Sequence, residues 1–449
     1  MAFTSSDPRR QNIAVIGSGI AGMSAAWLLS QQHDITVYEK NDRLGGHSNT
    51  VMVNTSLGPT PVDTGFIVFN DATYPNLIAL FDHLGVNTKA SDMSFGVSLR
   101  GGATEYSSVD PSAFLCGGRN LVSPRFWSMT WDLLRFYRDA PLELLATRDS
   151  MISLGEYLDS RGYGDAFQRD HLLPQAAAIW SASMGDIHHY PACAFVRFFE
   201  NHGLLKLKGR PIWRTVEGGS RAYVEKLTAP YAAKARLNAG AVSIRRDGAG
   251  VWVRDARGCV DRFDNVVIAT HGDEALAMLE DASVEERELL GAFKYAKNRA
   301  VLHTDAAFMP RRAPLWASWN YVGDHPDGGC VVTYWMNKLQ TIRSEEQLFL
   351  TLNPRTQPKP ETILYETSYD HPLFNAAAIR AQQQLWSLQG IRNTWFCGAH
   401  FGAGFHEDGL QSGLAVAEQL GGVRRPWVVE NESGRIHVGV PPQPRAIAA

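Results

Sequence analysis

The sequence has little that would tie it to a membrane, to nucleic acid or to an oxidising compartment. Its five cysteines are scattered without a Cys-x-x-Cys pair, which favours reduced thiols in a cytoplasmic setting over a disulfide framework. The net charge of −3 provides no excess of basic residues that would indicate a nucleic-acid partner. No segment has the roughly 20 apolar residues needed to span a bilayer. We therefore expect a soluble, cytoplasmic protein.

The composition is that of a globular protein with room for more than one hydrophobic core. Hydrophobic residues make up 45% and charged residues 20% of the 449 residues, so two domains are expected rather than one. The 14 histidines do not show the spacing with carboxylates or thiols that metal sites need, and we predict no metal site. The adjacent His188 and His189 are interpreted as polar loop residues.

The N-terminal segment predicts a dinucleotide-binding unit. An apolar strand over 12–17, a helix over 20–32 and a second strand over 34–40 form a strand–helix–strand unit. The turn before the helix reads Gly-Ser-Gly-Ile-Ala-Gly, in which glycine lets backbone N–H groups reach a pyrophosphate. Twin arginines before this unit could indicate an export signal, which would leave the glycine turn unexplained. The predicted contacts are Gly17, Gly19, Ala21 and Gly22, with Glu39 and the adjacent Lys40 at the ribose.

A second glycine pair decides which dinucleotide is expected. The segment that follows Glu39 closely is Arg43-Leu44-Gly45-Gly46-His47. Its glycine pair provides a second site where the backbone can approach an extended ligand, which suits FAD, with its longer ribityl–flavin arm, better than NAD. The block resembles the flavin monoamine oxidase superfamily, whose pattern is an acid followed by R-x-G-G-R. Histidine stands here where that family usually has arginine, so the resemblance implies a pyrophosphate held with less fixed charge or with pH-dependent charge.

Further blocks of the same superfamily follow in order along the chain. The resemblance implies that "PVDTGFIVFN" (61–70) passes beside the isoalloxazine and that "VEGGSRAYVEKL" (216–227) forms a glycine-pair-then-helix element. In the closing motif, "FCGAHFGAGFHEDGLQSG", a helix N-terminus would stabilise negative charge on the reduced flavin. The cofactor residues implied by these blocks are Gly65, Phe66, Ile67, Val242 (adenine), Gly398, His400 (where the family commonly has an acid), Asp408, Gly409 and Leu410.

The order of these blocks predicts an amine oxidase-like α/β fold. We expect a discontinuous Rossmann-type FAD-binding domain interleaved with a mixed α+β substrate domain. The predicted FAD-binding parts are 1–73, 213–284 and 389–422, and the substrate parts are 74–212 and 285–388. Residues 423–449, which are rich in proline, are expected to form an extended or loose C-terminal tail.

The function implied by resemblance is oxidation of a hydrophobic substrate. "LLPQAAAIWSAS" (172–183), "AVLHTDAAFMPRR" (300–312), "TYWMNKLQ" (333–340) and "TLNP" (351–354) are most similar to bacterial predicted FAD-binding oxidoreductases, which tend to be encoded beside cyclopropane-fatty-acid-synthase-like methyltransferases. The superfamily also contains phytoene desaturases and fatty-acid double-bond isomerases. The resemblance therefore implies hydride abstraction from a fatty acyl chain, giving desaturation or double-bond isomerisation. The alternatives are an amine oxidase for a small amine or polyamine, and a flavin-binding protein without turnover.

The residues that would carry catalysis are less clearly marked. The candidates are Arg299, Tyr334, Phe405 and His406. Phe405 falls near a position where amine oxidases place an aromatic ring. Asn298 or Arg299 falls where the family often has a lysine that holds a water near the flavin, which favours a dehydrogenase or isomerase over an oxidase. Cys397 lies in the wrong part of the motif for a covalent link, so FAD is predicted to bind non-covalently, with an electron acceptor that the sequence does not identify.

Residues 124–145 mix large apolar side chains with arginines, as helices at a lipid surface do. This segment could make peripheral contact with the inner face of the membrane, where an enzyme acting on acyl chains would find its substrate. The alternative is an amphipathic helix that only packs on the substrate domain. The residues that define the pattern are Arg125, Trp127, Trp131, Leu134, Arg135, Phe136, Tyr137 and Arg138.

Overall fold

The first lobe is built on a parallel sheet whose strands come from distant parts of the chain. The computed structural model describes residues 10–144, 152–323 and 331–439. The sheet has the order β10 (Ala235–Arg236), β2 (Asp34–Tyr38), β1 (Asn12–Ile16), β14 (Asn265–Ile268) and β20 (Thr394–Phe396), with every pair parallel. These short apolar strands are almost entirely buried, as expected for a sheet covered on both faces. The dinucleotide-type unit predicted for the N-terminus is thus the centre of this lobe.

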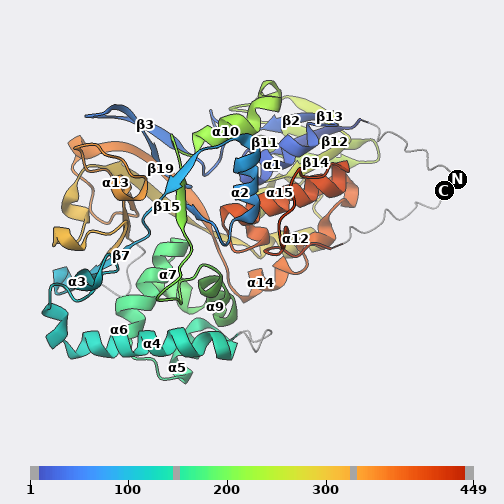
Figure 1. Cartoon of the computed structure of the whole chain (residues 1–449). Coiled ribbons are helices and arrows are strands. Elements are labelled where there is room, and N and C mark those ends of the chain that lie inside the picture. The colour runs from blue at the N-terminus through green and yellow to red at the C-terminus, as the bar shows by residue number, and fades with distance from the viewer. Residues whose placement is uncertain (1–9, 145–151, 324–330, 440–449) are drawn as a thin grey trace.

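Two helices from opposite ends of the chain pack together in this lobe. Helix α1 (Ile20–Leu29) follows β1 and is buried on all sides, and α15 (His406–Gly421) packs along it (Figure 1). The other elements of this lobe are α2 (Pro75–Leu84), α10 (Arg221–Thr228), α11 (Gly272–Met278), α12 (Val284–Gly291), α14 (Ala376–Gln382) and the antiparallel sheet of β11 (Ala241–Asp247), β12 (Gly250–Asp255) and β13 (Val260–Phe263).

The second lobe combines a mixed sheet with a layer of helices. Its strands have the order β19 (Ile363–Leu373), β15 (Lys294–His303), β18 (Phe349–Leu352), β17 (Val332–Trp335), β16 (Trp319–Gly323), β7 (Phe95–Leu99) and β8 (Thr104–Ser107). All pairs are antiparallel except β16 with β7. The helices are α3 (Pro111–Phe114), α4 (Pro124–Leu144), α5 (Leu154–Ser160), α6 (Asp165–Phe167), α7 (Leu173–Trp180), α8 (Met184–His188), α9 (Ala192–Asn201) and α13 (Met336–Leu339).

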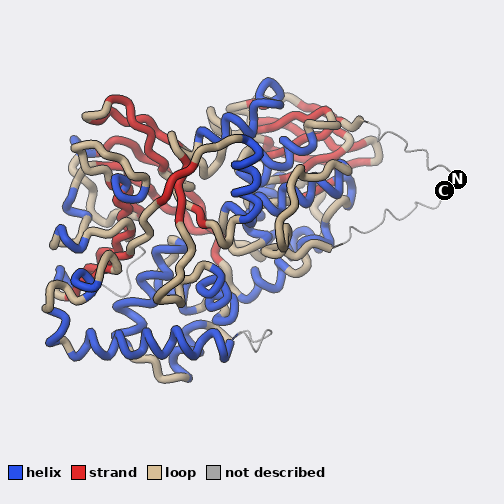
Figure 2. The backbone as a smooth tube through the Cα atoms, viewed as in Figure 1, coloured by secondary structure: helices blue, strands red, loops and turns tan. Residues whose placement is uncertain are grey.

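The long strands β15 and β19 run where the two lobes meet (Figures 1 and 2). Two smaller sheets are β3 (Thr50–Thr55) with β4 (Gly58–Asp63), and β5 (Phe69–Asn70) with β9 (Trp213–Val216) and β6 (Thr88–Ala90). This arrangement confirms the amine oxidase-like α/β fold class expected from the order of motifs.

The described part of the C-terminal segment is held in place by side-chain contacts. Residues 423–439 contain no helix or strand, but the Arg425 guanidinium pairs with Glu418 and Trp427 stacks on Trp27 at 5.9 Å between ring centroids. Arg435 pairs with the fully buried Asp408 of α15. These contacts replace the missing regular structure, because each one joins a tail side chain to the first lobe. Residues 440–449 lie outside the described part of the chain.

Two local expectations also need correction. The helix predicted over 20–32 ends at Leu29 and is followed by turns. His188 is the last residue of helix α8 and His189 is its C-cap, so the pair does not belong to a loop. His189 Nδ1 lies 2.8 Å from the Gly185 carbonyl oxygen, and this bond within the helical turn explains why a polar pair is tolerated there.

Candidate functional site

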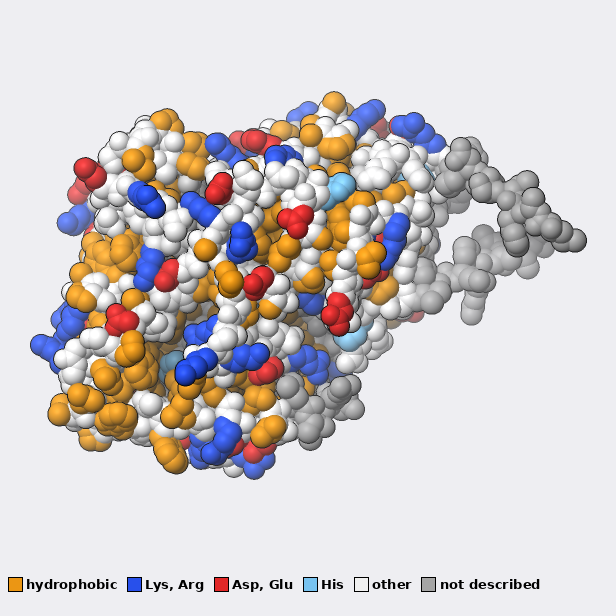
Figure 3. Space-filling model, in the orientation of Figure 1, with side chains coloured by type: hydrophobic (Ala, Val, Ile, Leu, Met, Phe, Trp, Pro, Cys, Tyr) orange, Lys and Arg blue, Asp and Glu red, His pale blue; other side chains and the backbone are white. Residues whose placement is uncertain are grey.

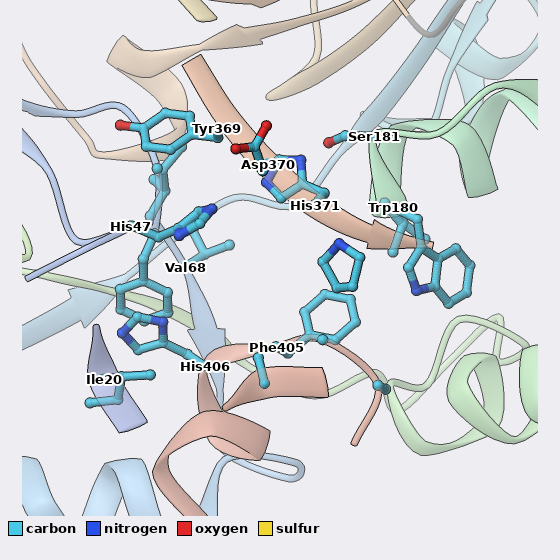
Figure 4. Close-up of a pocket in the computed structure, with 18 of the residues that line it drawn as sticks. Ile20, His47, Val68, Trp180, Ser181, Tyr369, Asp370, His371, Phe405 and His406 are labelled. Carbon is cyan, nitrogen blue, oxygen red and sulfur yellow. The ribbon is translucent and has the colours of Figure 1, made fainter. Parts of the chain in front are cut away.

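A cavity of about 350 Å³ lies between the two lobes. One end is lined by the β1–α1 turn, by residues 64–68 and by the loop before α15. The other end is lined by α7, α9 and strands of the second lobe, with β19 between them (Figure 4). Predicted site residues in the lining are Gly19, Ala21, His47, Gly65, Phe66, Ile67, Tyr334, Gly398, His400, Phe405 and His406.

The β1–α1 turn is shaped to receive a ligand at its surface. A Cβ atom on Gly22 would lie 2.0 Å from the Gly17 carbonyl oxygen, so only glycine lets the helix start this close to the strand. By contrast, a Cβ on Gly19 would meet no atom within 4 Å. Gly19 therefore presents backbone to open space at the N-terminus of α1, where unpaired N–H groups favour a pyrophosphate.

The second glycine loop packs directly on the first. A Cβ on Gly46 would lie 2.8 Å from Gly19 Cα, and a Cβ on Gly65 would lie 2.1 Å from the His47 carbonyl oxygen. The Arg43 guanidinium donates to the carbonyl oxygens of Gly46, at 2.9 Å, and Ser48, at 3.1 Å. Three segments distant in sequence thus meet backbone to backbone along one cleft, which fits the extended FAD molecule that the sequence predicts.

Two neighbouring charged residues of the predicted cofactor site, Glu39 and Lys40, differ in where their side chains lie. Glu39 is buried at the end of β2, where its carboxylate accepts from Ser18 N at 3.0 Å and Asn41 N at 2.8 Å. These bonds hold it beside the glycine turn in the position expected for ribose recognition. Lys40 instead points to solvent and pairs with Glu274 at 2.6 Å, so its side chain does not line the cavity.

His47 enters the cavity as a neutral side chain. Its ring lies 5.0 Å from that of Tyr369 and 5.5 Å from that of His371, between centroids. Burial, together with the nearby histidines His371 and His271, lowers the pKa of His47 well below its usual value. His47 therefore carries less fixed charge than the arginine that the resemblance implies at this position.

Helix α15 contributes its first residue, His406, to the lining of the cavity, whereas Asp408, Gly409 and Leu410 are buried behind it. The Asp408 carboxylate accepts from Phe405 N at 2.7 Å and from Arg435 Nε at 2.6 Å, so it caps the helix and faces away from the cavity. Gly409 and Leu410 are buried and Gly409 lies against Ile20. The predicted residues outside the lining are Gly17, Gly22, Glu39, Lys40, Arg43, Gly45, Gly46, Val242, Asp408, Gly409 and Leu410; of these, Val242 is half exposed on β11.

His406 and His400 mark the first-lobe end of the cavity. The His406 ring stacks on Phe66 at 3.8 Å between centroids, and its Nε2 atom lies 2.6 Å from the Tyr223 hydroxyl, which also bonds Ser48. Burial lowers the pKa of His406 to about 3. It lowers that of His400 to about 3 as well, so both rings are neutral near pH 7.

The second-lobe end is dominated by aromatic rings. Phe405 stacks on Phe198 at 4.8 Å, and Trp180 lies 4.7 Å from Phe198, between centroids. Tyr334 and Trp319 meet edge to face at 4.8 Å. These rings leave a narrow, largely apolar space in which a substrate would be shielded from water.

Arg299 was a wrong candidate for catalysis. Its guanidinium pairs with Glu366 at 2.6 Å and donates to Gln357 at 2.8 Å, and it does not line the cavity. Because side chains alternate along a strand, the neighbouring Asn298 faces the interior instead. Its amide donates to His371 Nδ1 at 3.0 Å and accepts from Asn353 Nδ2 at 2.7 Å.

Three further residues of the lining carry polar atoms that the sequence did not single out. Tyr369 and His371 lie two positions apart on β19, so strand alternation could have placed them on one face. His202 follows α9, and nothing in its local sequence signals that it lines the cavity. Among the described residues, no group of three His, Cys, Asp or Glu side chains is placed to hold a metal ion.

Known proteins resemble this chain over most of its length. The family described as flavin containing amine oxidoreductase matches residues 20–326. A Mycobacterium tuberculosis protein named "Putative flavin-containing monoamine oxidase AofH" is 26% identical over 325 residues, covering 70% of this chain and 68% of that protein.

Solved structures share the fold at low sequence identity. A CLA-producing fatty acid isomerase from P. acnes superposes with a TM-score of 0.66 at 19% identity, covering 92% of this chain and 98% of that one. Cyclohexylamine oxidase from Brevibacterium oxydans superposes with a TM-score of 0.64 at 17% identity, covering 92% and 99%. At these identities the structures show a common fold and do not choose between their substrates.

Proposed function

We propose that this chain, which belongs to the flavin-containing amine oxidoreductase family and is an FAD-dependent oxidoreductase, acts on a fatty acyl chain. The reaction would be desaturation, or double-bond isomerisation if the hydride returns to the chain. FAD, when bound, supplies the hydride acceptor. The residues that would hold it are those of the two glycine loops, with Glu39 at the ribose and the start of α15 at the far end of the cleft.

The observation that supports an acyl chain is the chemistry of the second-lobe end of the cavity. The described lining contains no lysine, arginine or glutamate, and its one acid is Asp370. Asp370 lies beside Tyr369 and His371, across the cavity from Phe405 (Figure 4). A cationic amine next to Phe405, Phe198 and Trp180 would lack a carboxylate partner, whereas an apolar chain would lose nothing on burial there.

Removal of hydride from an unactivated chain demands little acid–base help but a dry site. Phe405, Phe198 and Trp180 supply such a site, since the Phe405 ring stacks on that of Phe198 and the Trp180 ring packs against Phe198 at a tilt. Asn298 presents a neutral amide inside the lobe, where the superfamily resemblance leads us to expect a lysine. We therefore propose that electrons leave the flavin to an acceptor other than O₂.

Amine oxidation is the second candidate. It is favoured by the family itself and by the ring of Phe405, which lines the cavity and falls near a position where the resemblance implies an aromatic side chain in amine oxidases. A single anaerobic experiment separates the two. The purified holoenzyme is mixed with oleic acid, with dioleoyl phosphatidylglycerol vesicles or with putrescine, while the visible band of oxidised flavin is followed and the products are analysed by mass spectrometry.

Bleaching of the flavin with either lipid, or an altered double bond in the recovered lipid, supports the acyl-chain assignment. Bleaching with putrescine and an unchanged lipid would contradict it and support the amine oxidase. On exposure to air, slow peroxide release after reduction by lipid supports the proposed alternative acceptor, and stoichiometric rapid peroxide release contradicts it.

We further propose that α4 docks the protein on an anionic lipid surface. Its inner face, with Phe126, Met129, Leu133 and Phe136, is buried in the second lobe, while Trp127, Trp131 and Leu134 form a second apolar stripe that is exposed. Leu121 and Val122, just before the helix, extend this stripe. Figure 3 shows hydrophobic side chains gathered at the lower left, in the area of α3 and the first turns of α4, with basic side chains along the lower edge. Among the described helices, none is long and apolar enough to cross a membrane.

A further inference from the structure

We propose that His202 is the proton acceptor in the oxidation of the acyl chain. The assignment rests on the proposed function and adds to it a residue that receives the proton released with the hydride. It stands on three features of this side chain: a tautomer fixed by the backbone, a buried ring nitrogen without a partner, and a place in the aromatic end of the cavity.

The tautomer follows from one hydrogen bond. His202 Nδ1 lies 2.9 Å from the carbonyl oxygen of Phe198, one turn earlier in α9. A carbonyl oxygen can only accept, so Nδ1 must carry the proton, and in the neutral ring the free lone pair is then on Nε2. This Nε2 atom is buried and has no hydrogen-bond partner among the described residues. An unsatisfied buried acceptor in a cavity wall is costly unless a ligand uses it.

The ring is also in the right part of the cavity. His202 is 3% exposed and lines the cavity, with its ring stacked on Phe198 at 3.9 Å and 5.8 Å from Phe405, between centroids. These are the rings that shape the proposed acyl site. A chain lying along them would pass close to the His202 ring.

Two other histidines of the lining differ from His202 in this respect. The Asn298 amide nitrogen also donates to the Ala296 carbonyl oxygen, which fixes its orientation, so His371 Nδ1 accepts and its Nε2 carries a proton. His371 is therefore a hydrogen-bond donor to the cavity. His406 Nε2 is already engaged by Tyr223 and Ser48. His202 offers a free acceptor where these two do not. His400 Nε2 is also buried without a partner among the described residues, but His400 lies at the first-lobe end of the cavity, beside Phe293, and not among the rings of the aromatic end.

The electrostatics keep this lone pair available. Burial, with a smaller contribution from the charge of Arg435, lowers the pKa of His202 to about 3, so the ring is neutral throughout the physiological range. A weakly basic imidazole is sufficient here. A C–H bond beside a carbon that has lost hydride is far more acidic than an imidazolium, so proton transfer runs downhill.

The step balances as follows. One C–H bond of the chain would break, and its hydrogen would leave with both electrons; bound FAD would supply the two-electron acceptor for this hydride. The C–H bond on the adjacent carbon then breaks, its electron pair becomes the new C=C bond, and the proton forms an N–H bond at His202 Nε2. The chain is oxidised by two electrons, and the imidazolium later releases its proton to water. Without a proton acceptor, the hydride can only return, which gives an isomer instead of an additional double bond.

The test compares His202→Asn with His171→Asn. The asparagine amide can replace the Nδ1–H donor to Phe198 but places no acceptor where Nε2 lies. His171 is the matched control, because it is another buried histidine of the same lobe with an unpartnered Nε2, and it does not line the cavity. With oleic acid under anaerobic conditions, we expect flavin bleaching and diene formation to fall ~10²–10⁴-fold in His202→Asn only. FAD content should be unchanged, and positional isomers of oleic acid should persist.

The possible failures are distinguishable. If the wild type neither bleaches nor alters any lipid, the proposed function fails. If the wild type converts oleic acid to isomers without diene, or if His202→Asn makes diene at the wild-type rate, the acyl substrate stands and the role of His202 is overturned.

A second readout needs neither substrate nor turnover. In protein labelled with ¹⁵N-histidine, we expect one Nε2 resonance of the unprotonated type that persists from pH 8 to pH 5 and disappears in His202→Asn. Assignment of a protonated Nε2 to His202 would overturn the proposal whatever the lipid experiment shows.

Discussion

The two ends of the cavity differ in how their polar atoms are satisfied. At the cofactor end, the charged side chains of Glu39, Arg43 and Asp408 are all hydrogen-bonded within the protein, the glycine loops leave backbone facing open space, and His400 Nε2 is a buried polar atom without a partner among the described residues. At the other end, the buried polar atoms His202 Nε2, Gln175 Oε1, Trp180 Nε1 and Trp319 Nε1 have no partner among the described residues.

This difference separates a preformed binding cleft from a site that awaits its ligand. The first end is held by backbone contacts between loops, so its shape does not depend on what occupies it. The second end presents isolated donors and acceptors on apolar walls, which suits a long apolar molecule with few polar atoms.

The largest effect is expected from closing the preformed cleft. Gly22→Ala would place a methyl group 2.0 Å from the Gly17 carbonyl oxygen, and we expect loss of FAD and a marked fall in melting temperature. Gly19→Ala has open space for its methyl group and should fold normally while binding FAD less tightly, because the methyl group enters the cavity. The flavin content and the melting temperature of each variant are the measurements that check these expectations. Equal FAD content in Gly22→Ala and wild type would contradict the backbone argument.

The next largest effect, on the free energy of unfolding, is expected from removing the Arg435 charge that pairs with Asp408. The Arg435→Gln variant would leave a fully buried carboxylate without its ion pair, and breaking such a pair typically costs ~3–5 kcal/mol. Denaturant unfolding of the holoenzyme measures the loss. Arg424→Gln is the control, since that guanidinium is more than half exposed and pairs at the surface. Similar losses in the two variants would show that the tail contact does not stabilise the start of α15.

A smaller effect is expected from pH. Burial lowers the pKa of His171 to about 4, below the ~6.5 of an unfolded chain. Between these values the unfolded chain binds more protons, so the free energy of unfolding should fall as pH is lowered from 7 to 5. One such histidine accounts for ~2 kcal/mol over that interval. His171→Asn should show a shallower decline in denaturant titrations at pH 7 and 5. An unchanged decline would mean that His171 is accessible to protons in the folded state.

The smallest effect concerns the outer stripe of α4. Trp131 is 71% exposed, and Trp131→Gln should weaken binding to phosphatidylglycerol vesicles about tenfold without changing stability. Leu57→Gln, at an exposed turn between β3 and β4, is the control. Cosedimentation with vesicles of phosphatidylglycerol or of phosphatidylcholine measures the affinity. Equal binding of wild type and Trp131→Gln would leave the stripe without a role at lipid.

More of the cofactor end than of the substrate end could be predicted from the sequence, because the motifs at the cofactor end are formed by residues close together in the chain. Gly17, Gly19, Gly22 and Glu39 fall within one strand–helix–strand unit, whose spacing is set by backbone geometry. Arg299 and His202 show the opposite case. Strand alternation and the pairing of β15 with β19 decide that Arg299 faces Glu366 and that Asn298 faces His371.

The sequence by itself determined the dinucleotide loop and the second glycine loop that indicates FAD, since each depends on residues near one another in the chain. The order of such blocks along the chain determined the fold class. Only the tertiary structure decided that His202 lines the cavity, that Asp408 is turned toward Arg435, and that α4 keeps an exposed apolar stripe. The physical reason is that burial and the choice of partner depend on packing between elements that lie far apart in the chain, and local spacing does not record that packing.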